Sequence, residues 1–211
     1  MASNQEPQMA DVVLFHHVQG LTPGVQAIAQ ELESHGHTVH TPDFFDGVHP
    51  MDIDAGIGLV TELGESALTH RAIELVDSLP ADLVYAGISW GAVLAQRFAQ
   101  QRPGAIGAIL LEGFVDLDAE WSFGPWPPSV PVQIHGMEQD PFFSGEGDLE
   151  AARKFTAGSG ANVAELFTYP GSAHLFTDSS LPSHDARAFA QVMGHMTGFL
   201  ARVDPRNPQH E

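Results

Sequence analysis

Short runs of apolar and β-branched residues alternate along this chain with longer segments in which apolar residues recur at helical spacing. Val25, Ile28, Ala29 and Leu32, for example, stand three or four positions apart, as residues on one face of an α-helix do. The helical pattern predicts helices over residues 23–34, about 58–78, 91–101, 148–157 and 184–203. The β-rich runs predict strands over residues 11–16, 38–41, 83–86, 105–111, 130–135 and 164–169.

Strand and helix segments that alternate in this way are typical of an α/β protein. We therefore expect a mostly parallel sheet of about six to seven strands with helices on both faces. No linker or repeat divides the 211 residues, so we expect a single domain with flexible tails at residues 1–10 and 204–211. Ligands of such sheets bind beyond the carboxyl ends of the strands, so the residues that follow each predicted strand are candidates for a functional site.

Acidic residues far outnumber basic ones, with 27 Asp and Glu against 8 Lys and Arg, and the formal net charge is −19. This excess argues against nucleic acid and anionic membranes as partners, because both attract basic surfaces. The longest apolar run, residues 104–111, is much shorter than the roughly 20 residues of a membrane helix. The first residues lack the basic and apolar regions of a signal peptide. We expect a cytoplasmic protein that is a monomer or a homodimer.

A G-x-S-x-G sequence stands at residues 87–91, between a predicted strand and a predicted helix. In that context Ser89 would lie on a tight turn that exposes its hydroxyl, and the two flanking glycines would leave room for the crowded backbone. The N-terminus of the following helix would face the negative charge that develops during attack on a carbonyl. The chain has no cysteine, which excludes a thiolate nucleophile. The alternative is a glycine-rich turn with an incidental serine, since the chain holds 21 glycines.

A serine nucleophile needs a base, and suitable residues follow the last two predicted strands. Asp140 follows the fifth strand and His174 follows the sixth, which gives the order serine, acid and histidine of a strand-end triad. We assign His174 as the general base and Asp140 as the acid that orients it. Glu138 and Asp178 are rival candidates for the acid.

Twelve histidines are present, and three of them, His35, His37 and His40, have a spacing that resembles a metal site. They straddle a predicted helix end, a turn and a strand, so their convergence on one ion is not expected. Cysteine-ligated zinc is excluded by composition. We expect neither a metal nor a cofactor.

The chain resembles the dienelactone hydrolase family of α/β-hydrolases. The pieces that carry the resemblance occur in family order and together span residues 11 to about 203: they are residues 14–20, 41–45, 87–91, 135–140 and 169–176. The resemblance implies an α/β-hydrolase fold of one domain without a large lid, and a triad of Ser89, Asp140 and His174. It also implies that the backbone N–H groups of Trp90 and Val18 form the oxyanion hole.

The departures from the family pattern concern the substrate. The founding members use a cysteine nucleophile and carry a Glu after the first strand, whereas this chain has Ser89 and, near that Glu position, His17. They hold a substrate carboxylate with two arginines, and the corresponding regions here contain Asp46 and Asp178 but no Arg. We expect both aspartates near the mouth of the site, where they would repel a carboxylate. The sequence therefore favours a serine hydrolase of small neutral esters or lactones, acting through an acyl-enzyme on Ser89, over a dienelactone hydrolase.

Several residues in strand-end loops are expected to line the pocket for this small-molecule substrate: His17, Gln19, Phe45, Trp126, Phe142 and Phe143. Aromatic side chains in such loops can wall an apolar pocket, and they are equally consistent with plugs that pack the loops down. Two other functions remain open. One is thioester hydrolysis or acyl transfer by the same triad, and the other is a non-enzymatic binding protein on a hydrolase fold.

Overall fold

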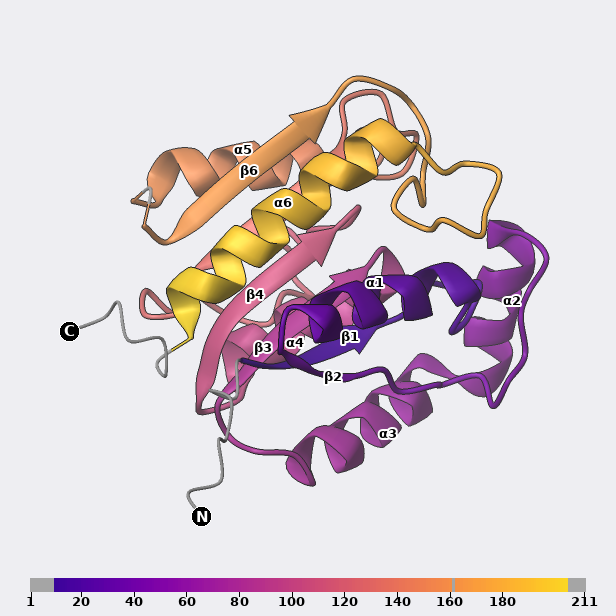
Figure 1. The fold of residues 1–211 in the computed structure, drawn as a ribbon, viewed down its shortest axis with the longest axis horizontal. Helices are drawn as coiled ribbons and strands as arrows, with labels where there is room; N and C mark the ends of the chain where they lie inside the picture. Colours follow the sequence, from indigo (N-terminus) through magenta and orange to yellow (C-terminus); the bar gives the residue numbers. More distant parts are fainter. Residues whose placement is uncertain (1–9, 161, 205–211) are drawn as a thin grey trace, which may run out of the picture.

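The computed structural model describes residues 10–160 and 162–204 and is built on one parallel sheet of six strands in the order β2-β1-β3-β4-β5-β6. The sheet confirms the predicted architecture (Figure 1). Every neighbouring pair of strands runs parallel. The strands are β1 (Asp11–Phe15), β2 (Thr38–His40), β3 (Leu83–Ile88), β4 (Ala105–Leu111), β5 (Val132–Met137) and β6 (Ala164–Tyr169).

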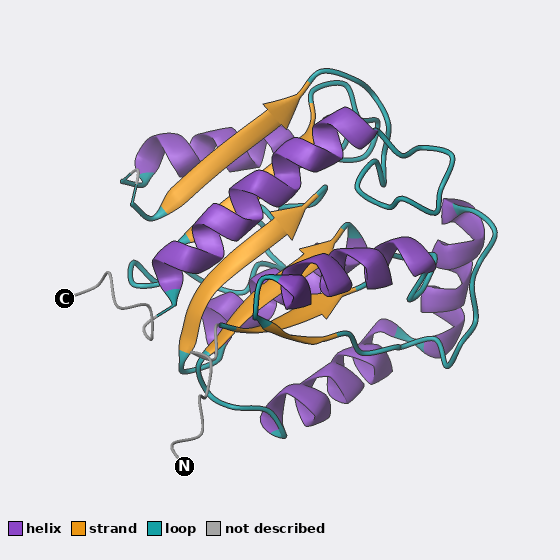
Figure 2. Cartoon of the chain, viewed as in Figure 1, coloured by secondary structure: helices purple, strands orange, loops and turns teal. Residues whose placement is uncertain are grey.

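Helices cover both faces of this sheet (Figure 2). One face carries α1 (Pro23–Ser34) and α6 (Ala186–Val203), and the other carries α3 (Glu65–Asp77), α4 (Trp90–Gln101) and α5 (Asp148–Gly158). The remaining helix, α2 (Ile53–Leu63), lies beyond the carboxyl ends of the strands (Figure 1). Among the described residues, no helix combines the length and the apolar character needed to cross a membrane.

The two apolar layers follow from the alternation of side chains along each strand. In β3, Leu83 and Tyr85 enter the core beneath α3 and α4, whereas Val84, Ala86 and Ile88 enter the core beneath α1 and α6. All six residues of β3 are buried, as expected for a central strand that is covered on both faces. The central strands thus form a rigid base for the loops at their carboxyl ends.

The observed elements differ from the predicted ones at a few positions. The helix expected over residues 58–78 is two helices, because Gly64 separates them with a left-handed φ of 83°. α6 begins at Ala186 rather than at residue 184, since the side chain of Asp185 caps it. Ala10 and Asp204, at the inner ends of the two segments expected to be flexible tails, are buried. Residues 1–9 and 205–211 of those segments lie outside the described residues.

Candidate active site

The candidate residues of the triad and the oxyanion hole gather at the carboxyl ends of four strands of the sheet. The chain order reverses between β1 and β3, because β2 lies on one side of β1 and all later strands lie on the other. Such a switch point leaves a crevice at the carboxyl edge, where open α/β sheets bind ligands. Val18 follows β1, Ser89 follows β3, Asp140 follows β5 and His174 follows β6.

The turn that carries Ser89 is strained and closely packed. Ser89 has φ 53° and ψ −115°, a region that residues with side chains rarely adopt. A Cβ atom on Gly91 would lie 2.3 Å from the carbonyl oxygen of Phe15, and one on Gly87 would lie 2.1 Å from the carbonyl oxygen of Gly91. Gly91 therefore allows the turn to approach β1, and Gly87 allows the turn to fold closely onto the start of α4. Because α4 begins at Trp90, the first N–H groups of that helix face the site.

A continuous chain of hydrogen bonds joins Ser89, His174 and Asp140. The Ser89 hydroxyl and Nε2 of His174 lie 2.8 Å apart, and Nδ1 of His174 lies 2.7 Å from Oδ2 of Asp140. The other carboxylate oxygen of Asp140 accepts the N–H of Phe142 at 2.8 Å, which fixes the orientation of the carboxylate. The structure thus brings together the three side chains that the sequence assigned to the triad. The rival acid Glu138 is exposed and bonds to Thr168 instead.

Glu112 is a third ionisable residue of the site, beside Asp140 and His174, and sequence reasoning missed it. It directly follows β4, with Oε2 3.9 Å from Nδ1 of His174, while Oε1 accepts the N–H and the hydroxyl of Thr177 at 3.2 and 2.7 Å. Burial raises the pKa of Glu112 to about 7, although the nearby His174 and the Thr177 hydroxyl act in the opposite direction. An acidic residue at the end of a wholly apolar strand was the available signal.

His174 is held in an acidic environment. Burial is the strongest influence and lowers its pKa, but the hydrogen bond that Nδ1 donates to Asp140 and the negative charges of Glu112 and Asp140 together outweigh it. The pKa of His174 is therefore raised above its usual value. The ring of Phe142 lies 4.6 Å from the imidazole, measured between centroids, and shields one side of it.

Backbone strain is concentrated around these groups. Among the described residues, four that are not glycine have positive φ, and three of these four are Ser89, Glu112 and Leu175, which follows His174. Such conformations cost roughly 1–3 kcal/mol each and persist where the surrounding structure enforces them. The strain is concentrated at the same edge of the sheet as the candidate site.

The loop after β1 is locked by a second buried pair. Nε2 of His17 lies 2.8 Å from Oδ2 of Asp178, and Nδ1 of His17 accepts the N–H of Gln19 at 3.1 Å. Asp178 also accepts hydrogen bonds from Thr22 and from the N–H and hydroxyl of Ser180. Burial alone would raise the pKa of Asp178, but these hydrogen bonds prevail and lower it to about 2.

This pairing corrects the expectation that Asp46 and Asp178 repel substrate at the mouth of the site. Asp178 is completely buried and pairs with His17. Asp46 is engaged by Arg71, whose guanidinium lies 2.8 Å from its carboxylate. The negative charge at the mouth comes from Asp52 and Asp54 instead.

A pocket of about 450 Å³ opens beside His174. Its other lining residues come from the loop after β1, from the start of α2 and from the loop after β6: Gln19, Met51, Asp52, Ile53, Asp54, Leu175, Leu181, Pro182 and Ser183. Its described lining contains no Lys or Arg. α2 also approaches the loop after β1, because a Cβ on Gly56 would lie 2.3 Å from the carbonyl oxygen of Val18.

The structure places only some of the six residues that were expected to line the pocket in or near it. Gln19 lines it, and Phe142 contacts the imidazole of His174. Phe45 is buried and its ring stacks on that of Trp90, with the centroids 5.7 Å apart, while His17 is buried in its pair with Asp178, so neither residue lines the pocket.

The expectations for Trp126 and Phe143 are also wrong, because both side chains belong to the core. The indole N–H of Trp126 donates to the carbonyl of Val130, and its ring packs on Phe155. Phe143 is completely buried, and a Cβ on Gly136 would lie 2.2 Å from its ring. The side chains of these two aromatic residues anchor their loops to the core, which is the alternative that the sequence left open.

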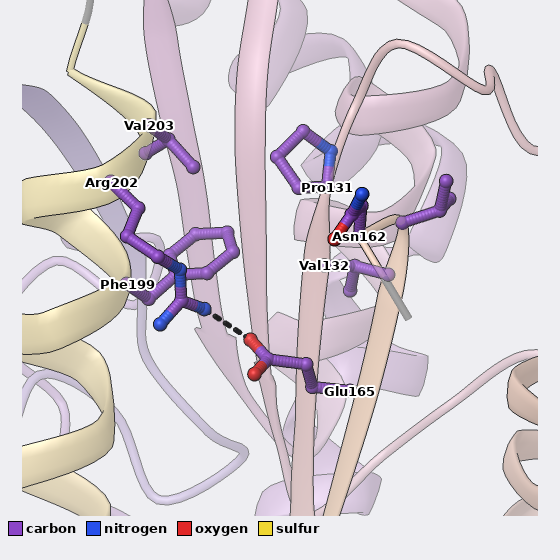
Figure 3. Close-up of a pocket in the computed structure, with 8 residues that line it drawn as sticks. Pro131, Val132, Asn162, Glu165, Phe199, Arg202 and Val203 are labelled. Carbon is purple, nitrogen blue, oxygen red and sulfur yellow. Dashed lines mark hydrogen bonds and ion pairs between the residues drawn. The ribbon is translucent and has the colours of Figure 1, made fainter. Parts of the chain in front are cut away.

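Another hollow, of about 480 Å³, lies at the opposite end of β5 and β6, against the end of α6 (Figure 3). Val132 and Glu165 line it near the amino ends of these strands, and Arg202 of α6 forms an ion pair with Glu165 across it. None of the candidate site residues lines this hollow.

Within the described residues, one group of side chains has the spacing that a metal ion would need: Glu112, Asp140 and His174, whose donor atoms lie within 4.8 Å of one another. Nδ1 of His174 is already hydrogen bonded to Asp140, so ion binding there would break the chain that leads to Ser89. The arrangement is better suited to proton transfer than to metal binding.

Comparisons with known proteins agree with this geometry. The model of the dienelactone hydrolase family matches residues 1–203. A solved structure from Klebsiella pneumoniae, provisionally called a dienelactone hydrolase, is 18% identical, with a TM-score of 0.73 over 95% of this chain and 90% of that one. A dienelactone hydrolase-like promiscuous phosphotriesterase from metagenomic libraries is 15% identical, with a TM-score of 0.71 over 96% and 90%.

A thermophilic esterase from Thermogutta terrifontis is 17% identical, with a TM-score of 0.60 over 95% of this chain and 85% of that one. No match is found among curated proteins. At these identities the solved structures show the fold, which is that of the α/β-hydrolases.

Proposed function

Because the chain belongs to the dienelactone hydrolase family, we propose that it is a serine hydrolase that cleaves small uncharged esters or lactones through an acyl-enzyme on Ser89. The observation that carries the proposal is the unbroken path of hydrogen bonds from Ser89 through His174 to Asp140. That path couples a nucleophile on a strained turn to a base whose other nitrogen is held by a carboxylate.

In the proposed first step, the Ser89 oxygen attacks the substrate carbonyl carbon while its proton passes to Nε2 of His174. Asp140 holds the imidazole so that Nδ1 carries a proton and Nε2 is free to accept one. The N–H groups of Trp90 and Val18 would stabilise the oxyanion of the tetrahedral intermediate, typically by about 3–4 kcal/mol per donor. His174 then gives its proton to the leaving alcohol oxygen, and the acyl group remains on Ser89.

In the second step, His174 takes a proton from water, and the resulting hydroxide attacks the acyl carbon. The intermediate collapses, the acid product leaves, and the proton on His174 returns to the Ser89 oxygen. These steps draw only on the side chains and the backbone N–H groups named above.

The pocket beside His174 supports an uncharged substrate. Met51, Ile53 and Leu181 give it an apolar wall, and Asp52 and Asp54 give it a negative rim. A carboxylate about 4 Å from one of these aspartates would be repelled by roughly 1 kcal/mol even in water. One of the structurally similar proteins is an esterase, in keeping with this substrate class.

Hydrolysis of p-nitrophenyl acetate and butyrate by the wild type, Ser89→Ala and His174→Ala tests the proposal. We expect both variants to lose activity by a factor of about 10³ or more, because the triad acts as one unit. Ser78→Ala is the matched control, since that hydroxyl is exposed and, among the described residues, donates only to the carbonyl of Leu75. Activity that survives in Ser89→Ala would overturn the proposal.

Two companion measurements separate the other candidate functions. Product analysis with a competing alcohol or amine distinguishes acyl transfer from hydrolysis, and thioester substrates test that bond type. A fluorophosphonate that labels Ser89 of the wild type, followed by mass spectrometry, reports an activated serine even when the chosen esters are poor substrates. A folded wild type that is neither active nor labelled would favour the binding protein.

A further inference from the structure

One carboxylate oxygen of Glu112 faces the imidazole of His174, and no hydrogen bond accounts for its position. Oε1 is occupied by Thr177, but Oε2 is buried and has no hydrogen-bond partner within the described residues. This oxygen lies 3.9 Å from Nδ1 of His174, the same nitrogen that Asp140 engages. A buried carboxylate oxygen without a donor is costly, so its position beside the imidazole calls for a physical reason.

We infer that Glu112 is a positioning residue for His174: it is a second carboxylate that faces the imidazole beside Asp140 and stabilises the imidazolium formed during catalysis. The catalytic role of Glu112 rests on the proposed function, whereas its electrostatic pairing with His174 does not depend on that function. In the triad step, the proton moves from Ser89 to Nε2 of His174, and Glu112 neither gains nor loses one.

The charged groups around Glu112 define when this pairing acts. Asp140 faces it from the loop after β5, and His174 faces it from the loop after β6. Asp148, at the start of α5, acts on the same His174, as does Glu146 just before it. Asp140, Asp148 and Glu146 thus all act on His174, and an additional negative charge on Glu112 is tolerated best when His174 is positive.

Two ionisable groups as close as Glu112 and His174 titrate as a coupled system. The states available to this pair include one in which a single proton resides on either residue. Ionised Glu112 favours the positive imidazole, since opposite charges within about 4–6 Å typically shift a pKa by 1–3 units. Removing the charge should therefore lower the pKa of His174.

Glu112→Gln removes the charge while it keeps an amide oxygen that can accept both bonds from Thr177. We expect an NMR titration of labelled histidine rings to show His174 titrating at least one pH unit lower in Glu112→Gln, in one step rather than in two coupled steps. The signal is assigned by its loss in His174→Gln. The matched control is Glu138→Gln, which removes an exposed carboxylate from the same edge of the sheet.

An unchanged His174 titration in folded Glu112→Gln would overturn the inference. If Glu112→Gln does not fold, Thr177→Val provides the second test, because loss of the hydroxyl bond favours protonated Glu112. We expect a smaller shift of His174 in the same direction, and an unshifted His174 would again overturn the inference.

The acid limb of kcat/KM for p-nitrophenyl butyrate should move to lower pH by the same amount as the NMR titration. This readout separates the two proposals. A shifted titration in an enzyme without esterase activity would uphold the pairing and reject the proposed function. Normal esterase activity in Glu112→Gln, with both the titration and the acid limb unmoved, would uphold the function and reject the role of Glu112.

Discussion

The His17 imidazole and the Asp178 carboxylate, 2.8 Å apart and both completely buried, join the loop after β1 to the loop after β6. The first loop carries Val18, whose N–H is proposed to bind the oxyanion, and the second loop carries His174. The pair thus fixes the distance between two parts of the site that are far apart in the sequence. Its loss should affect both stability and turnover.

Asp178→Asn replaces an acceptor of four hydrogen bonds by an amide, whose NH₂ group must then face donors. We expect a loss of roughly 2–4 kcal/mol in the free energy of unfolding at pH 7, measured with urea, and a fall in kcat of about tenfold. Asp46→Asn, which breaks an exposed ion pair with Arg71, should cost less than about 1 kcal/mol.

The contribution of Asp178 should depend on pH in a defined direction. Its pKa is lowered to about 2 in the folded state from an ordinary 3.8, so its ionised form stabilises the fold above pH 3.8. That contribution disappears as the pH falls from 3.8 towards 2. A stability difference between wild type and Asp178→Asn that is unchanged between pH 7 and pH 3 would contradict this assignment.

Gly91→Ala should disable the site through a steric clash. The new Cβ would lie 2.3 and 2.6 Å from the carbonyl oxygens of Phe15 and His16, which are backbone atoms that cannot turn away. We expect esterase activity to fall by at least a hundredfold and thermal stability to fall as well. The identical change at Gly194, on α6, meets no atom within 4 Å and should raise stability by up to about 1 kcal/mol.

His135 should make the fold sensitive to mild acid. Burial, together with the nearby His195, lowers its pKa to about 3 in the folded protein, whereas the unfolded chain binds this proton near pH 6.5. Unfolding is therefore favoured increasingly as the pH falls from 6.5 towards 3, and there is no such effect above pH 6.5.

Urea unfolding at pH 7.5 and pH 4.5 would measure this effect. His135→Gln should lose about 2–3 kcal/mol less than the wild type between these two values, since each pH unit corresponds to about 1.4 kcal/mol. His35→Gln is the control because His35 is exposed. Equal losses in all three proteins would refute the role of His135.

Asp54 should set the preference against acidic substrates. It lies on the rim of the pocket, and Asn has nearly the same shape without the charge. For Asp54→Asn, we expect the ratio of kcat/KM for a succinate monoester to that for a butyrate ester to rise about two- to fivefold at low ionic strength. The gain should shrink at high salt, and a ratio that does not move would place the specificity elsewhere.

Local signals in the sequence were sufficient to predict much of the fold and the three residues of the candidate triad. β4 is a continuous apolar run, and the G-x-S-x-G turn stands between a strand and a helix, so both could be predicted without knowledge of distant contacts. The order of Ser89, Asp140 and His174 was also visible in the chain, although the distances between their side chains were not.

The role of Glu112 could not be predicted, because it arises from contacts with residues far along the chain, such as Thr177 and His174. Trp126 and Phe143 show the converse problem. An aromatic residue in a strand-end loop has the same sequence signature whether it lines a pocket or fills the core, and here the packing of α5 and β5 places both in the core. Gly64 ended a helix through its backbone conformation, which composition alone does not reveal.

The position of β6 at the edge of the sheet should determine how the protein loses activity on heating. β6 pairs with only one strand and is mostly half-buried, yet it leads into the loop that carries His174. Edge elements open locally before a core unfolds, so a small excursion of β6 is enough to separate the imidazole from Ser89. Enzymatic inactivation should therefore precede loss of the core on heating, and activity should recover on cooling for as long as β3 and β4 remain intact.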